Sequence, residues 1–442
     1  MMSGNEANQR PNRGAIKFKT SFRNTILEAM KERGWRETEG DDWDLNWAER
    51  DTTYEVFDAQ HLQPWQRINH YRNDRELCRK DLLAKNLKKR KRQLQKDQDP
   101  EAQFYDFWPV TYVLPGDYPL FVEEFKRVGG FWIMKPIGSA QGKGIFMFSK
   151  LSQISKWKSD SRWKPDREDA QTYVVQKYLM SPYCVAGRKF DMRLYALVTN
   201  YVPLTAWFYR SGFCRFSSQR YDTSDMTNEA VHLTNVAIQK KLDTYDAESG
   251  GKWELRQLKL YLMSRYGIGV ADKLFYEIQM IVIRSLHSVQ PVMINDKHCF
   301  ELYGFDIMFD DQFKPWLIEV NASPSLTANT PEDRRLKVTM LHAVLDIVDL
   351  EGQRKGDEVR IGGFDLLVDA GQLRPPPAGA VYSSLLGTAI PSEQIARKPK
   401  PPEDGKPPAS GKDGGGKRAG AARGGAGDET KSDTPPGGGG LR

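Results

Sequence analysis

Short apolar runs, several of them alternating with polar positions, recur along the middle of the chain and predict strands. In such a run, successive side chains point to opposite faces of a sheet, so a period of two is typical of a strand. The run that begins at Phe131 ends at Pro136, which cannot donate a hydrogen bond within a sheet. Strands are predicted over residues 131–136, 172–179, 194–199, 299–309, 315–321 and, as a last ordered strand, 362–368.

Apolar residues recur with helical spacing in other parts of the chain. Helices are predicted over residues 76–96, 257–287 and 332–349, and residues 14–75 carry shorter stretches rich in tryptophan. Strands that alternate with helices favour an α/β or α+β fold. A chain of 442 residues allows two to three domains and a large buried core.

The last 68 residues, 375–442, differ in composition from the rest of the chain. They hold 15 of the 37 glycines and 11 of the 25 prolines, and Tyr382 is their one aromatic residue. Such a segment buries too little apolar surface to offset the entropy lost on ordering. We therefore expect a disordered tail from Pro375 onward.

The overall composition indicates a globular protein. Hydrophobic residues are 39% and charged residues 28%, and no apolar run is long enough for a membrane-spanning helix. The N-terminus is polar, which argues against a secretory signal. The four cysteines, Cys78, Cys184, Cys214 and Cys299, lack the spacing of a zinc site or a disulfide framework. A reducing cytosolic or ciliary compartment fits this composition.

The net charge of +7 is concentrated in one segment. Residues 76–96 carry nine Lys or Arg residues against two acids, so the remainder of the chain sums to zero. A dense basic helix points to a polyanionic partner, which could be nucleic acid, anionic lipid or an acidic protein surface.

Two late strands carry the strongest candidate site. Period two places Asp306 on the face opposite Phe305, and it places Glu319 and Asn321 on the same face as Leu317. A hairpin between the strands would bring Asp306, Glu319 and Asn321 together, and three oxygen ligands suit Mg²⁺. The alternative is a set of ordinary solvent-facing polar residues on an antiparallel sheet.

A glycine-rich loop follows the strand that ends in Lys135-Pro136. Its backbone N–H groups could approach phosphates closely, although the spacing is neither that of a P-loop nor that of a protein kinase. The alternative is a surface hairpin turn.

Three further motifs are weaker. Charged residues over 188–193 lead into an apolar strand, and residues 232–235 (His-Leu-Thr-Asn) offer short polar side chains. Arg215 lies between aromatic residues, so it either faces a pocket or extends along the surface.

Taken in order, these motifs resemble the tubulin tyrosine ligase-like family of ATP-grasp ligases. The resemblance spans about residues 15–368 and is closest to the short tubulin polyglutamylases of cilia and flagella. It implies an α+β, ATP-grasp fold with a nucleotide held between two sheet-containing subdomains. The implied divisions are an N-terminal substrate-binding domain with the basic helix (14–130), a central domain (131–190) and a C-terminal domain with the Mg²⁺, ATP and glutamate site (191–370).

The resemblance also implies a role for each motif residue. Residues matching the ATP-binding positions are Lys135, Gln141, Gly142, Gln176, Lys177, Tyr178, Leu179, Lys189, Phe190, Asp191, Thr234 and Asn235. Asp306, Glu319 and Asn321 match the Mg²⁺ ligands, and Arg215 and Lys252 match positions that hold free L-glutamate. Arg193 is the implied catalytic residue, stabilising charge on an acyl phosphate or a tetrahedral intermediate.

The implied activity is ATP-dependent ligation of glutamate to glutamate side chains in the acidic C-terminal tails of tubulin. The expected location is the cytoskeleton, in the axoneme and basal body of a cilium or flagellum, with non-catalytic subunits as further partners. The basic helix would then attract those tails. Alternatives are a ligase that adds tyrosine or glycine and a catalytically idle microtubule-binding scaffold. A nucleic-acid partner is not expected, because residues 79–96 lack aromatic residues for base stacking. Membrane insertion is not expected either, because no apolar run is long enough to span a bilayer.

Overall fold

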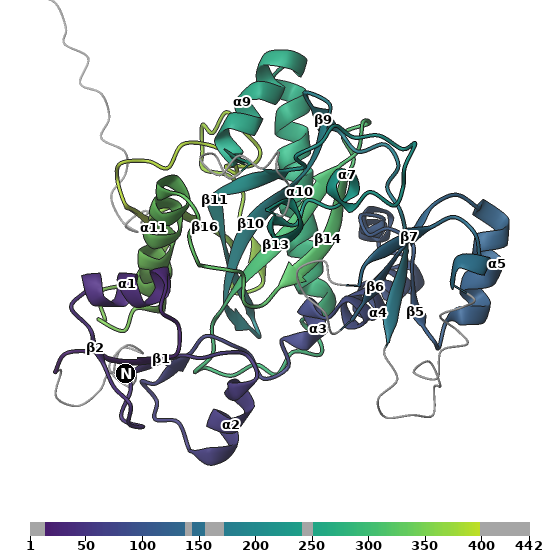
Figure 1. The fold of residues 1–442 in the computed structure, drawn as a ribbon. Coiled ribbons are helices and arrows are strands. Elements are labelled where there is room, and N and C mark those ends of the chain that lie inside the picture. The colour runs from purple at the N-terminus through teal and green to yellow at the C-terminus, as the bar shows by residue number, and fades with distance from the viewer. Residues whose placement is uncertain (1–13, 138–143, 155–171, 241–250, 398–442) are drawn as a thin grey trace, which may run out of the picture. The chain divides into compact units, whose positions relative to one another are not determined.

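The computed structural model describes residues 14–137, 144–154, 172–240 and 251–397. These residues belong to one compact unit built on three sheets (Figure 1). The glycine-rich loop with Gln141 and Gly142 lies outside the described residues. Among the described helices, none combines the length and the apolar character needed to cross a membrane.

The largest sheet is antiparallel and forms the centre of the fold. Its strand order is β14 (Pro315–Asn321), β13 (Glu301–Phe309), β10 (Arg188–Tyr201), β11 (Leu204–Phe216), β16 (Phe364–Asp369), β15 (Glu358–Ile361) and β18 (Ile395–Arg397). Three short strands pair with members of this row: β9 (Cys184–Val185), β12 (Lys252–Glu254) and β17 (Gln372–Leu373).

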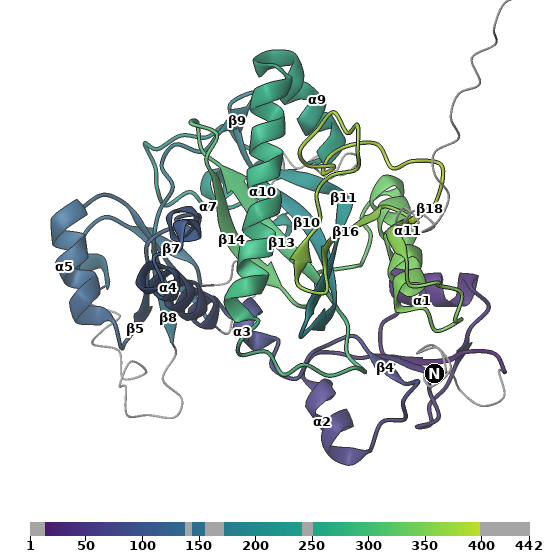
Figure 2. The same ribbon diagram turned by 180° about the vertical axis from the view of Figure 1, so that it is seen from behind.

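Alternation along β10 divides its side chains between two cores. Met192, Leu194 and Ala196 pack on the face covered by α9 (Leu255–Tyr266) and α10 (Ile268–Val289), and Figure 2 shows α10 crossing that face. Tyr195 and Leu197 pack on the other face, in a core with residues of α1 (Thr25–Glu32) and α11 (Pro331–Val348). The site residues Asp191 and Arg193 alternate along β10 in step with Tyr195 and Leu197, so they lie on this second face of the sheet.

The second sheet is smaller and antiparallel. Its order is β5 (Thr111–Leu114), β8 (Tyr173–Lys177), β6 (Trp132–Pro136) and β7 (Phe146–Phe148), and α5 (Tyr118–Val128) packs on it through Phe121. β5 and α5 precede residue 131 and pack with the strands of this sheet, and the expected boundary between the N-terminal and central domains stays a prediction.

The N-terminal sheet is parallel and consists of short strands. Its order is β2 (Arg36–Glu37), β1 (Lys17–Thr20), β3 (Leu45–Trp47) and β4 (Arg67–Ile68). The remaining described elements are α2 (Thr52–Ala59), a 3₁₀ helix over Pro100–Tyr105, α7 (Glu229–His232) and α8 (Val236–Gln239).

Two predicted helices are interrupted in the structure. The basic segment forms α3 (Arg75–Cys78) and α4 (Lys80–Lys96), separated by Arg79, whose backbone is extended with φ −84° and ψ 125°. The predicted helix over 257–287 divides at Gly267, whose φ of +84° suits a residue without Cβ. Helical periodicity continued through both breaks, so the pattern alone did not reveal them.

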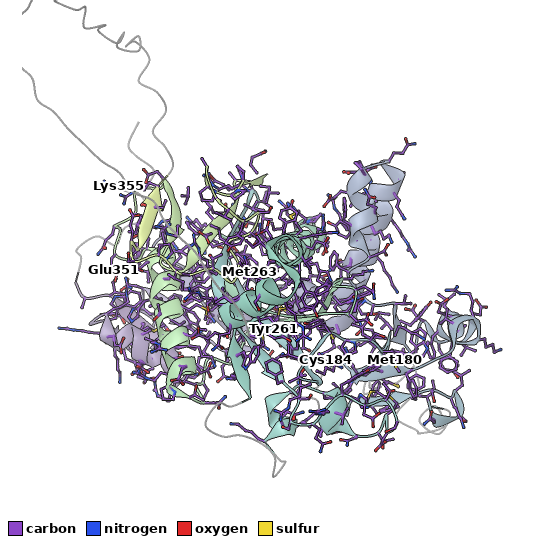
Figure 3. The ribbon with its side chains drawn as sticks, turned by 90° about the horizontal axis from the view of Figure 1, so that it is seen from above. Met180, Cys184, Tyr261, Met263, Glu351 and Lys355 are labelled. Atoms are coloured by element: carbon purple, nitrogen blue, oxygen red, sulfur yellow. The ribbon has the colours of Figure 1, made fainter. Side chains whose placement is uncertain are left out.

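The expectation of disorder from Pro375 is wrong for residues up to 397. β18 pairs with β15, and Leu386 is 2% exposed within the core formed with α9 and α10. Lys259 of α9 donates to the backbone oxygens of Ser384 (3.2 Å) and Leu386 (2.8 Å). The Tyr382 hydroxyl lies 3.8 Å from the sulfur of Met263, which Figure 3 labels on α9.

Gly387 explains how this segment, 378–397, approaches α10 so closely. A Cβ at Gly387 would lie 2.7 Å from the Phe275 ring, and its φ is +71°. A few anchoring residues hold the segment in place. Average composition does not reveal such residues, and for this reason it suggested disorder.

Truncation should therefore destabilise the protein if it removes residues 375–397. Leu386→Ala should lower the free energy of unfolding by about 2–5 kcal/mol, because it leaves a cavity in a packed core. Denaturant unfolding of the full chain measures this change. Truncation after Arg397 retains the described contacts and is the matched control. Equal stability of the parent, a chain ending at residue 374 and Leu386→Ala would contradict the packing of this segment.

Candidate functional site

A cavity lies between the second sheet and the central sheet. It contains about 1050 Å³ of empty space, part of which is open to solvent, enough for a nucleotide-sized ligand. β6 and β8 contribute one wall, and β10, β11, β13 and β14 contribute the other. Predicted residues that line it are Lys135, Gln176, Lys177, Tyr178, Leu179, Lys189, Asp191, Arg215, Thr234, Asn235, Asp306, Glu319 and Asn321.

The predicted acidic hairpin is present. β13 and β14 pair antiparallel with Asp306 opposite Glu319, and the Asn321 Nδ2 atom lies 3.5 Å from a carboxylate oxygen of each. A flip of the Asn321 side-chain amide would place its oxygen, in place of Nδ2, beside the carboxylates of Asp306 and Glu319. The two orientations of an amide are distinguished only by their hydrogen bonds. The three side chains can therefore offer three oxygen donors to one cation.

A bulge corrects the predicted facing of β14. Register shifts between the pairs Asp306–Glu319 and Ile307–Leu317, which leaves Ile318 without a partner. Leu317 is buried in the core, on the face opposite Glu319, and Ile318 lines the cavity beside Glu319. Strict alternation predicted the wrong face for Leu317, because the bulge adds one residue to β14 and so reverses the face on which the residues before it lie.

Asp306 joins two arginines, the buried Arg193 and the partly buried Arg215. Arg193 donates to both of its carboxylate oxygens, at 2.5 Å from Nε and 3.0 Å from Nη2, and Arg215 lies 2.8 Å from Oδ2. Arg215 also binds Asp191 through two nitrogens. The result is a chain of alternating charges across three strands, in the order Arg193, Asp306, Arg215 and Asp191.

This charge chain sets the ionisation of Asp306. Burial alone would raise the pKa of the carboxyl group, but the charges and hydrogen bonds of Arg193 and Arg215 outweigh it and hold the pKa well below its ordinary value. Asp306 therefore stays ionised, as a cation ligand must.

Gly304 makes room for the Arg193 side chain. A Cβ at Gly304 would lie 3.2 Å from the Arg193 Cδ atom and 2.8 Å from Pro324. Arg193 can consequently lie against β13 and reach Asp306 two residues further along. This requirement accounts for a glycine inside an otherwise bulky buried strand.

Two buried lysines face the cavity from opposite walls. Lys135 donates to Gln176 (2.8 Å), and burial, reinforced by the charge of Lys80, lowers its pKa to about 8. Lys189 donates to the Tyr178 hydroxyl (3.0 Å) and the His232 carbonyl (2.8 Å), and burial lowers its pKa to about 7. Unpaired buried ammonium groups favour an anionic ligand, which would restore their charge.

Lys80 and His232 also line the cavity; Lys80 is not among the predicted site residues, and His232 belongs to the polar motif over residues 232–235. Lys80, in the first turn of α4, lies 3.4 Å from the Glu319 carboxylate. His232 Nδ1 lies 3.0 Å from the Tyr178 hydroxyl. The signal for Lys80 in the sequence is the pair of charged residues that flank it, Arg79 and Asp81. In the structure these two form a bidentate ion pair that fixes the start of the helix.

Three predicted residues do not line the cavity. Phe190 packs in the core against Phe216 and Phe309, because its parity along β10 is opposite to that of Asp191. Lys252 pairs with Asp333 of α11 at 2.9 Å, although its strand places it directly opposite Arg215. Arg193 acts on the cavity through Asp306 and does not line it.

The basic face of α4 is only partly available to a partner. Lys88 donates to the Thr111 carbonyl (2.5 Å) and Lys91 pairs with Asp106. The exposed cations of the described helix are Lys85, Lys88, Lys89, Arg92 and Lys96.

Comparison with known proteins assigns the chain to a defined group. The model of the tubulin-tyrosine ligase family matches residues 58–356. "Probable tubulin polyglutamylase TTLL9" of Bos taurus is 42% identical over 409 residues, 85% of this chain and 89% of that protein. "Probable tubulin polyglutamylase ttll-9" of Caenorhabditis elegans is 46% identical over 356 residues, 80% of this chain and 85% of that protein. "Probable alpha-tubulin polyglutamylase Ttll1" of Tetrahymena thermophila is 42% identical over 386 residues, 81% of this chain and 94% of that protein.

The charge chain predicts that Asp306→Asn and Glu319→Gln differ in stability. Asp306→Asn leaves Arg193 and Arg215 short of a counter-charge in a buried site, so it should lower the free energy of unfolding by about 3–5 kcal/mol. Glu319 is half-buried and contacts Lys80 at the cavity wall, so Glu319→Gln should change that free energy by less than about 1 kcal/mol. Denaturant titration compares the two, and equal losses would show that Asp306 does not hold the site together.

Proposed function

The chain belongs to the tubulin-tyrosine ligase family, and we propose that it is a tubulin polyglutamylase, a ligase that adds glutamate to tubulin. The observation that carries this proposal is the 42–46% identity, over most of the chain, to relatives that bear this name. The acidic hairpin and the buried lysines of the cavity support it, because amide ligation at the expense of ATP needs both a cation site and a polyphosphate site.

We further propose that the cavity binds ATP with Mg²⁺. Asp306, Glu319 and Asn321 would hold the cation, which supplies positive charge to the phosphate oxygens when bound. Lys135 and Lys189 would bind the phosphates, and Lys80 would add a third cation from α4. Residues proposed to contact the rest of the nucleotide are Gln141, Gly142, Gln176, Lys177, Tyr178, Leu179, Asp191, Thr234 and Asn235. Phe190 would act only through the packing that places Lys189 and Asp191.

The proposed reaction activates a carboxylate before the amide forms. The γ-carboxylate of a tubulin glutamate takes the terminal phosphoryl group of ATP, which gives an acyl phosphate and ADP. The α-amine of free glutamate then attacks that carbonyl carbon, phosphate leaves, and the amine gives up a proton. Positioning and charge neutralisation carry most of the rate enhancement. Arg193 would serve as a positioning residue, because its guanidinium is held by Asp306.

Arg215 and Lys252 remain the proposed subsite for the incoming glutamate. Of the two placements expected for Arg215, the one that faces a pocket is found, and its guanidinium also binds both Asp191 and Asp306. Asp191 lies 24 residues away on the preceding strand, and Asp306 lies on β13, so the pattern around Arg215 did not reveal these partners. Arg215→Ala would therefore disturb the nucleotide and cation residues as well, and it cannot test amino-acid choice by itself.

The acceptor is proposed to be an acidic tubulin tail, attracted by the exposed lysines and arginine of α4. Microtubules of a cilium or flagellum are the proposed location, and non-catalytic subunits are proposed partners. Electrostatic attraction of this kind speeds association and weakens with salt.

Mass spectrometry of tubulin tails tests the activity. Microtubules incubated with the protein, ATP, Mg²⁺ and glutamate should gain glutamyl residues, and Glu319→Gln should reduce the rate at least about a hundredfold, because the cation site loses a charged ligand while the fold persists. The reaction is repeated with an extract of ciliated cells, which supplies any non-catalytic subunit that the activity requires. Incorporation of tyrosine or glycine instead, or equal activity of Glu319→Gln, would overturn the proposal.

The two lysines predict how nucleotide binding depends on pH. The pKa of Lys189 is about 7 and that of Lys135 about 8, so both are charged at low pH and lose their protons as the pH rises. An anionic ligand binds the protonated forms, so affinity for ATP should be constant below about pH 7 and fall by up to about tenfold per pH unit and lysine above it. Calorimetric titrations up to about pH 9 measure this.

Lys189→Arg is the matched control for this titration, because arginine keeps its charge throughout the range. This variant should remove one of the two steps. An affinity that stays level up to pH 9 in the parent protein would contradict the placement of these lysines on the phosphates.

A further inference from the structure

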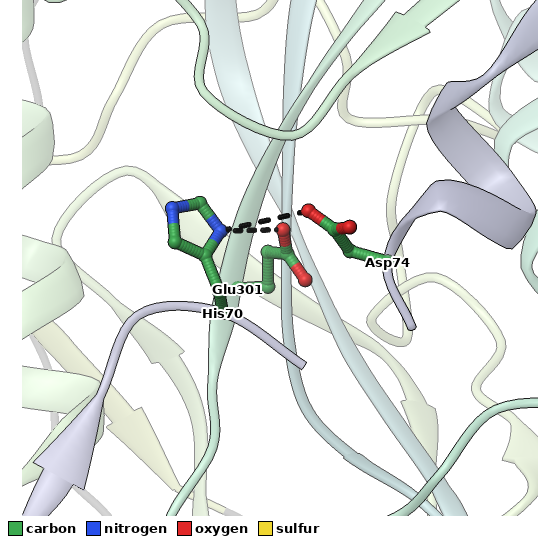
Figure 4. A group of neighbouring side chains, drawn as sticks. All are labelled: His70, Asp74 and Glu301. Carbon is green, nitrogen blue, oxygen red and sulfur yellow. Dashed lines mark hydrogen bonds and ion pairs between the residues drawn. The ribbon is translucent and has the colours of Figure 1, made fainter. Parts of the chain in front are cut away.

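A second group of metal-binding side chains lies apart from the cavity. His70 follows β4, Asp74 precedes α3, and Glu301 is the first residue of β13. They are 1%, 1% and 0% exposed. Figure 4 shows their polar ends converging, and one ligand atom from each lies within 4.8 Å of the others.

The outward-facing atoms of these three side chains are already held. Glu301 Oε2 accepts from the Tyr71 backbone (3.1 Å) and the Tyr303 hydroxyl (2.9 Å). Arg50 donates to Asp74 Oδ1 at 3.0 Å. These contacts orient both carboxylates so that their other oxygens face the centre of the group.

Within the described part of the chain, one inward-facing oxygen lacks a donor, and the donor of the other depends on the tautomer of His70. Asp74 Oδ2 has no hydrogen-bond partner among the described residues, and it lies 3.8 Å from His70 Nδ1. Glu301 Oε1 lies 2.8 Å from the same nitrogen. His70 Nε2 lies 3.3 Å from the Ser323 hydroxyl. If the imidazole proton is on Nε2, the lone pairs of His70 Nδ1, Asp74 Oδ2 and Glu301 Oε1 point at one another. Such an arrangement requires a positive species at its centre.

Charge counting leads to the same requirement. Asp74 and Glu301 bring two negative charges, and Arg50 supplies one positive charge to the buried group. The inward-facing oxygens of both carboxylates approach the same nitrogen, His70 Nδ1, at 3.8 Å and 2.8 Å, so the two negative charges lie close together in a buried position. With Arg50 counted, the group carries a net charge of −1, and a divalent ion would change it to +1 and so remove the excess of negative charge.

We propose that His70, Asp74 and Glu301 bind a divalent transition-metal ion, with Zn²⁺ as the ion that this ligand set fits best. One imidazole nitrogen and two carboxylate oxygens are zinc ligands, and bonds of about 2.0–2.2 Å place neighbouring ligand atoms roughly 3.3 Å apart. The separations in the structure, 2.8 Å from His70 Nδ1 to Glu301 and 3.8 Å from it to Asp74, lie on either side of that value. This site is distinct from the proposed Mg²⁺ site, whose donors are all oxygens.

The ion would have a structural role. Its ligands come from the loop after β4, the start of α3 and the start of β13, so it would fasten the N-terminal segment to the central sheet. Glu301 lies on the same strand as Asp306, and Ser323 follows Asn321 by two residues, so the ion would also hold the base of the acidic hairpin. Because the group is fully buried, the ion would be taken up during folding and exchange slowly.

Metal analysis of the full chain tests this directly. The protein, purified without a metal-affinity step and passed over a chelating resin, should contain about one equivalent of zinc or another first-row transition metal. Glu319→Gln, which alters the other cation site, should retain it, and Asp74→Asn should lower the content roughly tenfold or more. A wild-type chain without bound transition metal, whose melting temperature does not rise on refolding with Zn²⁺, would overturn the proposal.

The stability of Asp74→Asn separates the ion from a proton. If a proton shared between Asp74 and Glu301 occupies the centre, an amide at position 74 replaces a neutral carboxyl group, and thermal stability should stay level or rise. If the proposal is right, the same variant loses the ion and its melting temperature falls. Should Asp74→Asn fail to fold, the metal content of the wild-type chain still decides the question.

Discussion

The charge chain through Asp306 is the interaction on which the arrangement of the site depends. Three strands of the central sheet each place charged side chains at one end of one face, and like charges are kept apart by alternation. A carboxylate between two guanidinium groups can remain ionised in a buried position, whereas a lone one would take up a proton. The sheet can therefore present an acidic hairpin to the cavity without losing its charge.

The cavity also holds two buried cations, Lys135 on the wall of the second sheet and Lys189 on β10 of the central sheet. Both lysines are buried with hydrogen-bond acceptors, and among the described residues neither ammonium group forms an ion pair with a carboxylate. Burial therefore lowers the pKa of both groups. A ligand that carries several negative charges and a divalent cation would satisfy both walls together. The tubulin-tyrosine ligase family assignment and this electrostatic match support the same function through independent observations.

Much of this site could be predicted from local patterns. The turn between residues 309 and 315 and the polar positions in two apolar strands led directly to the pairing of Asp306 with Glu319. The ion pairs of Arg215 could not be predicted in this way, because Asp191 and Asp306 reach it only through strand pairing. The bulge at Ile318 and the extended backbone of Arg79 are likewise set by packing, and period counting does not detect them. Residues 378–397 show the same limit, since Leu386 and Gly387 anchor a segment whose average composition resembles a linker.

The central claim is that the cavity between the two sheets is a magnesium-dependent nucleotide site. Calorimetric titration of the protein with a non-hydrolysable ATP analogue, with and without Mg²⁺, tests it most directly, because it needs neither tubulin nor a partner subunit. Mg²⁺ should strengthen binding by about tenfold or more in the parent protein, and Glu319→Gln should remove this gain while still binding the metal-free analogue. Nucleotide binding that is absent, or that is equally strong with and without Mg²⁺, would contradict this claim.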